Sequence, residues 1–293
     1  MPRLPNILIT AIVLSVAMTG GASSGANDEP ASTWHRDYSE AVVAAKSSHK
    51  LLLIQFHAPE ETARDRQLAE RISHALSEPN RRDRFVVARL PIDFAIDHDE
   101  KPERLLQHAA FAEMHGRPGL TIVDFTDPAS GTFHHVVSIY PLAKQDEIRA
   151  EHLAVLLDLP AGTLTQRTLI FAVRTHAESP ASTAGEWHPV LVDEAHRHAS
   201  HQAKITLQGH HNWQNRFERI NTKLPTGLLA QEVCAESWPG QELLEAAREC
   251  VHSWRQSSGH WDAVKSRHPI FGYDMQRGAN GVWYATGIFG RPH

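Results

Sequence analysis

Three side chains that can bind a metal ion or transfer a proton lie on one face of a predicted helix. Glu194, His198 and His201 are spaced at i, i+4 and i+7, which places them on one face of a helix from Leu191 to Ile205. Carboxylate and imidazole groups at this spacing could in principle hold a divalent metal ion. The same helix carries an apolar stripe that it needs for packing, so we interpret this face as a solvated or half-buried polar face.

Histidine is the one residue type that stands out in the composition. The chain has 21 histidines among 293 residues and a formal net charge of −5. An unperturbed imidazole has a pKa of about 6.5, so this net charge is sensitive to mild acid. The histidines are spread along the chain and are not gathered in a metal-binding tract. We therefore interpret most of them as dispersed surface groups.

The remaining composition is that of an ordinary globular protein. Hydrophobic residues make up 41% of the chain and charged residues 22%, which excludes collagen-like, coiled-coil and wholly disordered chains. There are 29 basic and 34 acidic residues. The chain therefore lacks the excess of positive charge expected of a nucleic-acid-binding protein, and we expect no nucleic-acid partner.

The first 26 residues have the pattern of a cleavable signal peptide. Met1-Pro2-Arg3 is a short basic start, residues 7–18 are apolar, and Ser24 and Ala26 occupy the −3 and −1 positions of a cleavage site. A membrane-spanning helix needs about 20 apolar residues, and no later segment approaches that length. The sequence thus predicts a secreted or periplasmic protein without a transmembrane segment after signal cleavage.

The two cysteines allow at most one disulfide bond. They are Cys234 and Cys250, and an exported protein is in a compartment where disulfides form. Their apolar neighbours equally fit two buried thiols that pack as small hydrophobic groups. The sequence leaves both interpretations open.

The first half of the chain alternates predicted helices and strands, which favours an α/β layer fold. A turn at residues 127–131 precedes the last predicted strand, and the segment 157–167, with its Pro160 and Gly162, is the best domain boundary. The predicted helices cover residues 37–48 and 62–76, and the predicted strands cover residues 51–56, 85–90, 120–125 and 132–140.

Three features of residues 33–158 resemble a thioredoxin-like domain. They are the strand end Phe56-His57-Ala58, the helix that follows it, and Arg117-Pro118 just before a later strand. In that family the proline at this place is commonly cis. Where the family has Cys-x-x-Cys, this chain has Glu61-Thr62-Ala63-Arg64, which supplies no thiolate. The resemblance therefore implies a redox-inactive module, and we expect it to contact a protein partner.

Five short stretches of the second half occur in an informative order. The most specific, residues 254–260, matches Trp-x-x-Ser-Pro-Gly-His with one change. Residues 164–291 resemble the CAP superfamily of cysteine-rich secretory, antigen 5 and pathogenesis-related proteins, because the five stretches occur in the same order as in that family. The domain of this superfamily is also called the SCP domain, and the resemblance is closest to the bacterial branch of the superfamily. The stretches are Ala195-x-x-His198-Ala199-x-x-Gln202-Ala203, Gly209-His210 with Arg216, Glu232-Val233-Cys234-Ala235, residues 254–260, and Tyr284-x-Thr286-Gly287-x-Phe289-Gly290.

This resemblance implies an α-β-α sandwich around a cleft. Eukaryotic members line that cleft with two histidines and two glutamates. The first histidine corresponds to His210, or to His211 if the register slips by one, and the first glutamate corresponds to Glu232. The second acid falls on Ser257 and the second histidine on Tyr284, so half of the set is lost. His260, from the most specific stretch, completes the six expected cleft residues.

The expected two-domain fold, an α/β domain followed by a CAP-type α-β-α sandwich, leads to three functional hypotheses. The first is an exported, non-catalytic binding protein whose cleft takes a small apolar or peptidic ligand, with lipids as the first class to test. The second is a peptidase-like hydrolase that uses Glu232 and His210 on a water molecule. The third is a structural envelope protein. One histidine and one glutamate are too few for a tight zinc site, so we expect no metal and no cofactor.

Overall fold

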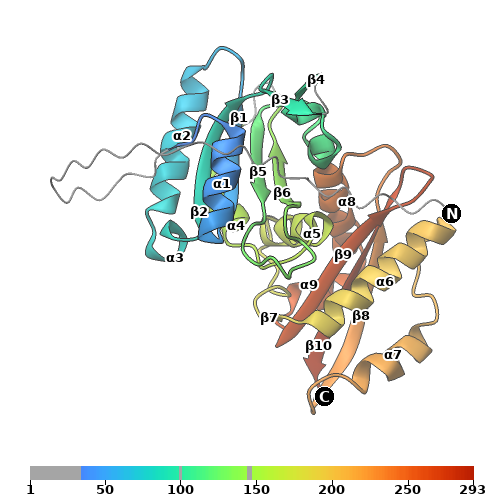
Figure 1. The fold of residues 1–293 in the computed structure, drawn as a ribbon. Helices are drawn as coiled ribbons and strands as arrows, with labels where there is room; N and C mark the ends of the chain where they lie inside the picture. Colours follow the sequence, from blue (N-terminus) through green and yellow to red (C-terminus); the bar gives the residue numbers. More distant parts are fainter. Residues whose placement is uncertain (1–33, 99–100, 144–146) are drawn as a thin grey trace.

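The computed structural model describes residues 34–98, 101–143 and 147–293, so the predicted signal peptide lies outside the described residues. The fold is a mixed α/β arrangement with two four-stranded sheets and a small two-stranded hairpin (Figure 1). Among the described residues, no helix combines the length and the apolar character that a membrane crossing requires.

The first sheet has the strand order β2-β1-β5-β6, with β1 and β2 parallel and the other neighbours antiparallel. Helix α1 packs against β1 and β2. The elements of this half are α1 (Tyr38–Ser48), β1 (Leu51–His57), α2 (Ala63–Leu76), α3 (Pro79–Arg82), β2 (Phe85–Pro91), β3 (Ala95–His98), β4 (Lys101–Arg104), the 3₁₀ helices η1 (Leu105–Gln107) and η2 (Ala109–Met114), β5 (Gly119–Val123), β6 (Val136–Pro141) and α4 (Ala150–Leu157).

Local sequence explains where these elements begin. Helix α2 begins with a capping box in which Thr62 and Asp65 satisfy each other's backbone N–H groups. All seven residues of β1 are buried, as expected for a central strand with both faces covered. The predicted elements are confirmed with small shifts, the largest being in β6. That strand begins only at Val136, because the preceding turn is held by the Asp124 carboxylate, which accepts a hydrogen bond from Thr132.

Two features of the thioredoxin resemblance can be compared with the structure. Pro118 differs from the cis proline that is common at this place in the family, because no peptide bond among the described residues is cis. Glu61, at the place of the missing Cys-x-x-Cys, forms an ion pair with Arg89 at 2.9 Å. The carboxylate therefore compensates the charge of a nearly buried guanidinium.

The second sheet has the order β7-β9-β10-β8 and is covered on both faces. Helices α6 and α7 contact the sheet from one side, and α5, α8 and α9 contact it as well (Figure 1). The elements are α5 (Leu164–Arg174), β7 (Glu186–Trp187), α6 (Pro189–Ile205), α7 (Trp213–Asn221), β8 (Leu228–Glu236), α8 (Leu243–Gln256), α9 (Ser258–Lys265), β9 (Ile270–Arg277) and β10 (Trp283–Pro292).

Strand alternation divides the side chains of β8 between the two faces. Val233 and Ala235 join the large apolar core that includes α8 residues, so Glu232 and Cys234 face α6. Cys250 belongs to the same core as Val233 and Ala235, and both thiols are free. The strand itself separates the two sulfur atoms, which rules out the disulfide interpretation.

Helix α5 joins the two halves of the molecule. Every residue from Gln166 to Val173 is buried, and the helix contacts β6 of the first sheet as well as α8 and β9 of the second half. One continuous cluster of buried apolar residues runs from Tyr38 to Phe289. An ion pair between Arg117 and Glu242 also links the halves. The division into domains 33–158 and 164–291 stays a prediction.

Candidate functional site

A buried carboxylate forms the centre of the site. The Glu232 side chain is 1% exposed and lies on the face of β8 that α6 and α7 cover. Arg216, from α7, donates to both of its oxygens: Nη1 is 3.2 Å from Oε1, and Nη2 bonds to Oε2. A bidentate ion pair between arginine and a carboxylate, as seen here, compensates the charge of a buried carboxylate.

His210 contacts the same carboxylate from the loop before α7. Its Nδ1 lies 2.9 Å from Glu232 Oε1, and its Nε2 lies 3.2 Å from Nε2 of His260 on α9. Burial alone raises the pKa of Glu232, but hydrogen bonds from His210 and Arg216 bring it below its ordinary value. Glu232 is therefore ionised at neutral pH, and Arg216, Glu232, His210 and His260 form one connected chain of polar contacts.

His198, on α6, lies on the other side of Glu232. Its Nε2 lies 2.8 Å from the carbonyl oxygen of Gly209 and 3.8 Å from Glu232 Oε1. Burial lowers the pKa of His198 to about 4, so the imidazole is neutral and its Nε2–H donates to the carbonyl. The amide oxygen of Gln202 accepts from Gly209 N at 3.0 Å, which fixes the loop that carries His210.

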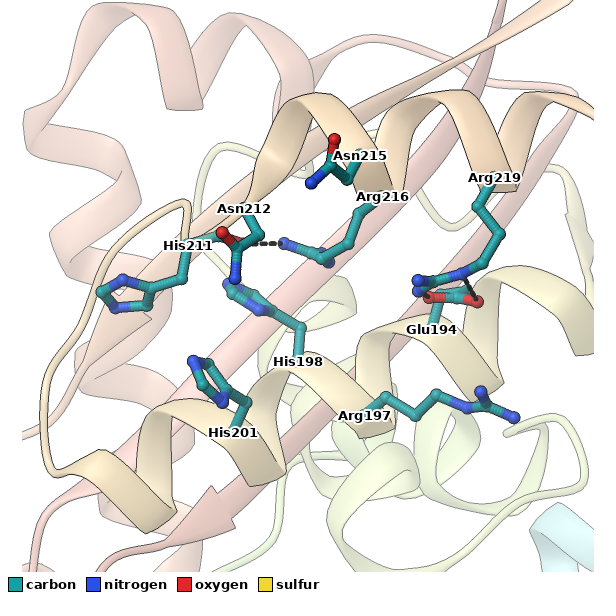
Figure 2. A pocket seen from close by; sticks show the side chains of 9 residues that line it. All are labelled: Glu194, Arg197, His198, His201, His211, Asn212, Asn215, Arg216 and Arg219. Carbon is teal, nitrogen blue, oxygen red and sulfur yellow. Dashed lines mark hydrogen bonds and ion pairs between the residues drawn. The ribbon is translucent and has the colours of Figure 1, made fainter.

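An open pocket of about 390 Å³ lies between α6 and α7 beside these residues (Figure 2). Its wall consists almost entirely of side chains that donate or accept hydrogen bonds. The lining residues are Glu194, Arg197, His198, His201, His211, Asn212, Asn215, Arg216 and Arg219.

Each guanidinium at this pocket has a carboxylate partner. Arg219 Nε is 3.2 Å from Glu194 Oε1, a contact that closes one end of the pocket in Figure 2. Arg197 contacts Asp193 at 2.9 Å. Arg216 is bound by Glu232, as described above. The pocket is thus polar without a large uncompensated charge.

The structure brings together three of the six expected cleft residues, namely His210, Glu232 and His260. His211 does not contact Glu232, because its Nε2 lies 3.2 Å from the carbonyl oxygen of Leu207. His210 is therefore the histidine that pairs with the glutamate.

The other two expected residues lie elsewhere. Ser257 is at the junction of α8 and α9, where its N–H donates to Trp254 O and its carbonyl accepts from Trp261 N. Tyr284 is 1% exposed, packs with Ala203 and Val282, and its hydroxyl accepts from Asn280 at 2.9 Å. Of the six expected cleft residues, only His211 lines the pocket between α6 and α7; His210, Glu232 and His260 lie beside it.

The polar face of α6 differs from its interpretation from sequence. Glu194 and His198 are only 1% and 2% exposed, so the expectation of a solvated or half-buried face was wrong for both residues. Helix α7 supplies Arg219 to Glu194, and β8 brings Glu232 close to His198. His198 and Arg216 contact the centre of this site, although neither was among the six expected cleft residues. His198 was noted in the sequence only for its spacing on the polar face of its helix and its place in a CAP-like stretch, and Arg216 only for its place in such a stretch.

One group of described residues has ligand atoms close enough to hold a metal ion. These atoms, on His198, Glu232 and Cys234, lie within 4.8 Å of one another. Glu232 is already bound by Arg216, and burial raises the pKa of the Cys234 thiol well above its ordinary value. A metal ligand must be deprotonated, so this set is a poor binding site.

The geometry also limits the chemistry available to His210 and Glu232. Both nitrogens of His210 have partners, and both oxygens of Glu232 are bound by Arg216. Cys234 Sγ is 3.7 Å from His210 Nδ1, but its raised pKa keeps the thiol protonated. The site therefore offers no activated thiolate, and His210 Nε2 could accept a proton from a substrate or water only by giving up its contact with His260.

Comparisons with known proteins give little further information. No model of a protein family matches the chain, and no curated protein matches it. Among solved structures, the chain is similar to an outer surface protein from Borrelia burgdorferi, with 20% sequence identity and a TM-score of 0.30. That likeness covers 37% of this chain and 78% of the other chain. A TM-score this low does not indicate a shared fold, so function is argued from the site alone.

Proposed function

We propose that this chain is an exported, non-catalytic binding protein whose pocket between α6 and α7 takes a peptidic ligand. In this proposal residues 164–291 are a CAP-type domain of the α-β-α sandwich class. Residues 33–158 are a redox-inactive thioredoxin-like module that contacts a protein partner. The resemblances in sequence support both assignments, and the basic start, apolar run and small residues of 1–26 support export.

One observation carries the choice of ligand. The pocket of about 390 Å³ is lined by guanidinium, imidazole, amide and carboxylate groups. Peptide backbones supply donors and acceptors that match the exposed amides of Asn212 and Asn215, whereas a lipid tail would displace water from such an amide without a new hydrogen bond, at a cost of roughly 1–3 kcal/mol each. Of the two ligand classes expected from sequence, the lining favours the peptidic one.

The hydrogen bonds at the centre of the site support binding without turnover. Glu232 and His210 are held in a closed network by Arg216 and His260. A hydrolase that used them on a water molecule would need one of these groups free to accept a proton. The network instead fixes the loop and the helix that form the pocket.

Incubation of the purified chain with a random peptide library, followed by mass spectrometry of bound and free fractions, tests this proposal. We expect enrichment of uncleaved peptides, and at least a tenfold weaker affinity in Asn215→Ala, which removes an exposed amide from the pocket. Arg248→Gln, at an exposed position of α8, is the matched control and should bind as the wild type does.

Two outcomes would contradict the proposal. If the wild type produced cleaved peptides and Glu232→Ala did not, the hydrolase hypothesis would be established instead. Equal and weak retention of all peptides by the wild type and by Asn215→Ala would favour a structural envelope protein.

A further inference from the structure

We propose that His198, His201 and His211 form a binding site for a divalent transition-metal ion at one end of the pocket between α6 and α7. The three imidazoles come from α6 and from the loop before α7. All three line the pocket, and Figure 2 shows them gathered at the end opposite the pair of Arg219 and Glu194.

The spacing of the three rings is close to that of a three-histidine zinc site. The ring centroids are 6.3 Å apart for His198 and His201, 6.0 Å for His198 and His211, and 5.6 Å for His201 and His211. With zinc-to-nitrogen bonds of about 2.0–2.1 Å in tetrahedral geometry, the centroids of coordinated imidazoles lie about 5 Å apart. The ligand nitrogens of the three histidines do not all lie within 4.8 Å of one another, so the rings must turn and approach by roughly 1 Å to share one ion. The side chain of His201 is exposed, so this movement displaces no core packing at that residue.

Backbone carbonyls fix the orientation of two of the rings. His198 Nε2 lies 2.8 Å from Gly209 O, and His211 Nε2 lies 3.2 Å from Leu207 O. Donation from Nε2–H to a carbonyl places the proton on that nitrogen and leaves Nδ1 with its lone pair. Histidine ligands of metal ions usually make such a hydrogen bond through the nitrogen that does not bind the metal.

The charges around the three rings permit a cation. The guanidinium groups at the pocket, on Arg197, Arg216 and Arg219, are each paired with a carboxylate. Imidazole ligands suit zinc, copper, nickel and cobalt better than magnesium or calcium.

The alternative donor set contains His198, Glu232 and Cys234. It requires Glu232 to leave Arg216, and it requires a thiol with a raised pKa to ionise. The three-histidine site requires neither change. Three protein ligands also leave a fourth position for water, and the pocket has room for it.

Titration of the tag-free full-length protein, first stripped with a chelator, tests the site. Zn²⁺ binding is followed by calorimetry, and Co²⁺ binding by its visible absorption. We expect one tight equivalent per chain and the absorption of tetrahedral cobalt. His201→Ala and His211→Ala should each weaken binding at least tenfold, and the control His74→Ala, an exposed histidine on α2, should bind as the wild type does.

Two results would overturn the proposal. One is affinity unchanged in both His201→Ala and His211→Ala, with circular dichroism showing that the variants are folded. The other is loss of binding in Cys234→Ser together with a sulfur-to-cobalt charge-transfer band, which would assign the ion to the alternative donor set. No peptide is present in this titration, so the metal site and the proposed peptide binding can fail separately.

Discussion

Both terminal nitrogens of Arg216 contact the carboxylate of Glu232 inside the wall of the pocket, where each side chain is at least nine-tenths buried. This pair links α7 to β8, and through Glu232 it also positions His210. Removing one partner would leave the other charge buried without compensation, and this is the physical basis of the first prediction.

Glu232→Gln should lower the free energy of unfolding by about 3 kcal/mol, because the Arg216 guanidinium loses its counter-charge in a dry environment. Urea denaturation followed by circular dichroism measures the change. Glu186→Gln, at an exposed glutamate of β7, is the matched control and should change stability by less than about 0.5 kcal/mol. An equal effect of the two substitutions would contradict the assignment.

Stability should fall between pH 6.5 and pH 4, in part because of His198. Its folded-state pKa is about 4, whereas an unfolded histidine titrates near 6.5. Over this interval the unfolded chain binds the additional proton, so acid favours unfolding by at most about 1.4 kcal/mol per pH unit for this residue. His198→Gln retains a donor for Gly209 O and should lose less stability than the wild type between pH 7 and pH 5. Identical pH slopes of unfolding free energy would show that His198 does not contribute.

Neither cysteine should react with a thiol reagent in the folded protein. Cys234 and Cys250 are 2% and 0% exposed, and burial raises the pKa of each thiol, so little thiolate is available. Ellman's reagent should detect no thiol per chain without denaturant and two in guanidinium chloride. A non-reduced sample that still gave no reaction after unfolding would indicate a disulfide and contradict the placement of the sulfur atoms on opposite sides of β8.

Gly272→Ala should destabilise the protein by about 2 kcal/mol, because α6 crosses β9 too closely for a side chain. A Cβ atom at this position would lie 2.3 Å from the carbonyl carbon of Leu191 and 2.4 Å from the backbone nitrogen of Val192. The control is Gly259→Ala on α9, where a Cβ atom meets nothing within 4 Å. That substitution should be neutral or stabilise the helix by up to about 1 kcal/mol. Thermal unfolding of both variants measures the difference.

Much of the local structure could be predicted from periodicity. The apolar run that begins at Leu51 forms the buried strand β1, as predicted. Leu191, Ala195 and Ala199, which are spaced as on one side of a helix, lie on the buried face of α6. These elements follow from hydrophobic pattern and capping, which depend on residues close together in the chain. The pairing of His210 with Glu232 was expected from the CAP resemblance, and the structure places their nearest atoms 2.9 Å apart.

The sequence by itself determined the main helices and strands of the first half and helix α6, and its resemblance to the CAP superfamily pointed to one histidine and one glutamate of the site. Only the tertiary structure decided that Cys234 and Cys250 face opposite sides of β8, that Glu194 and His198 are buried, and that His211 lies near His201. The physical reason is that these relationships depend on how α6 and α7 pack on the sheet, and no pattern within a single segment records the contact of one element with another. For the same reason the sequence predicted no metal site, whereas three histidines from two segments now form a candidate.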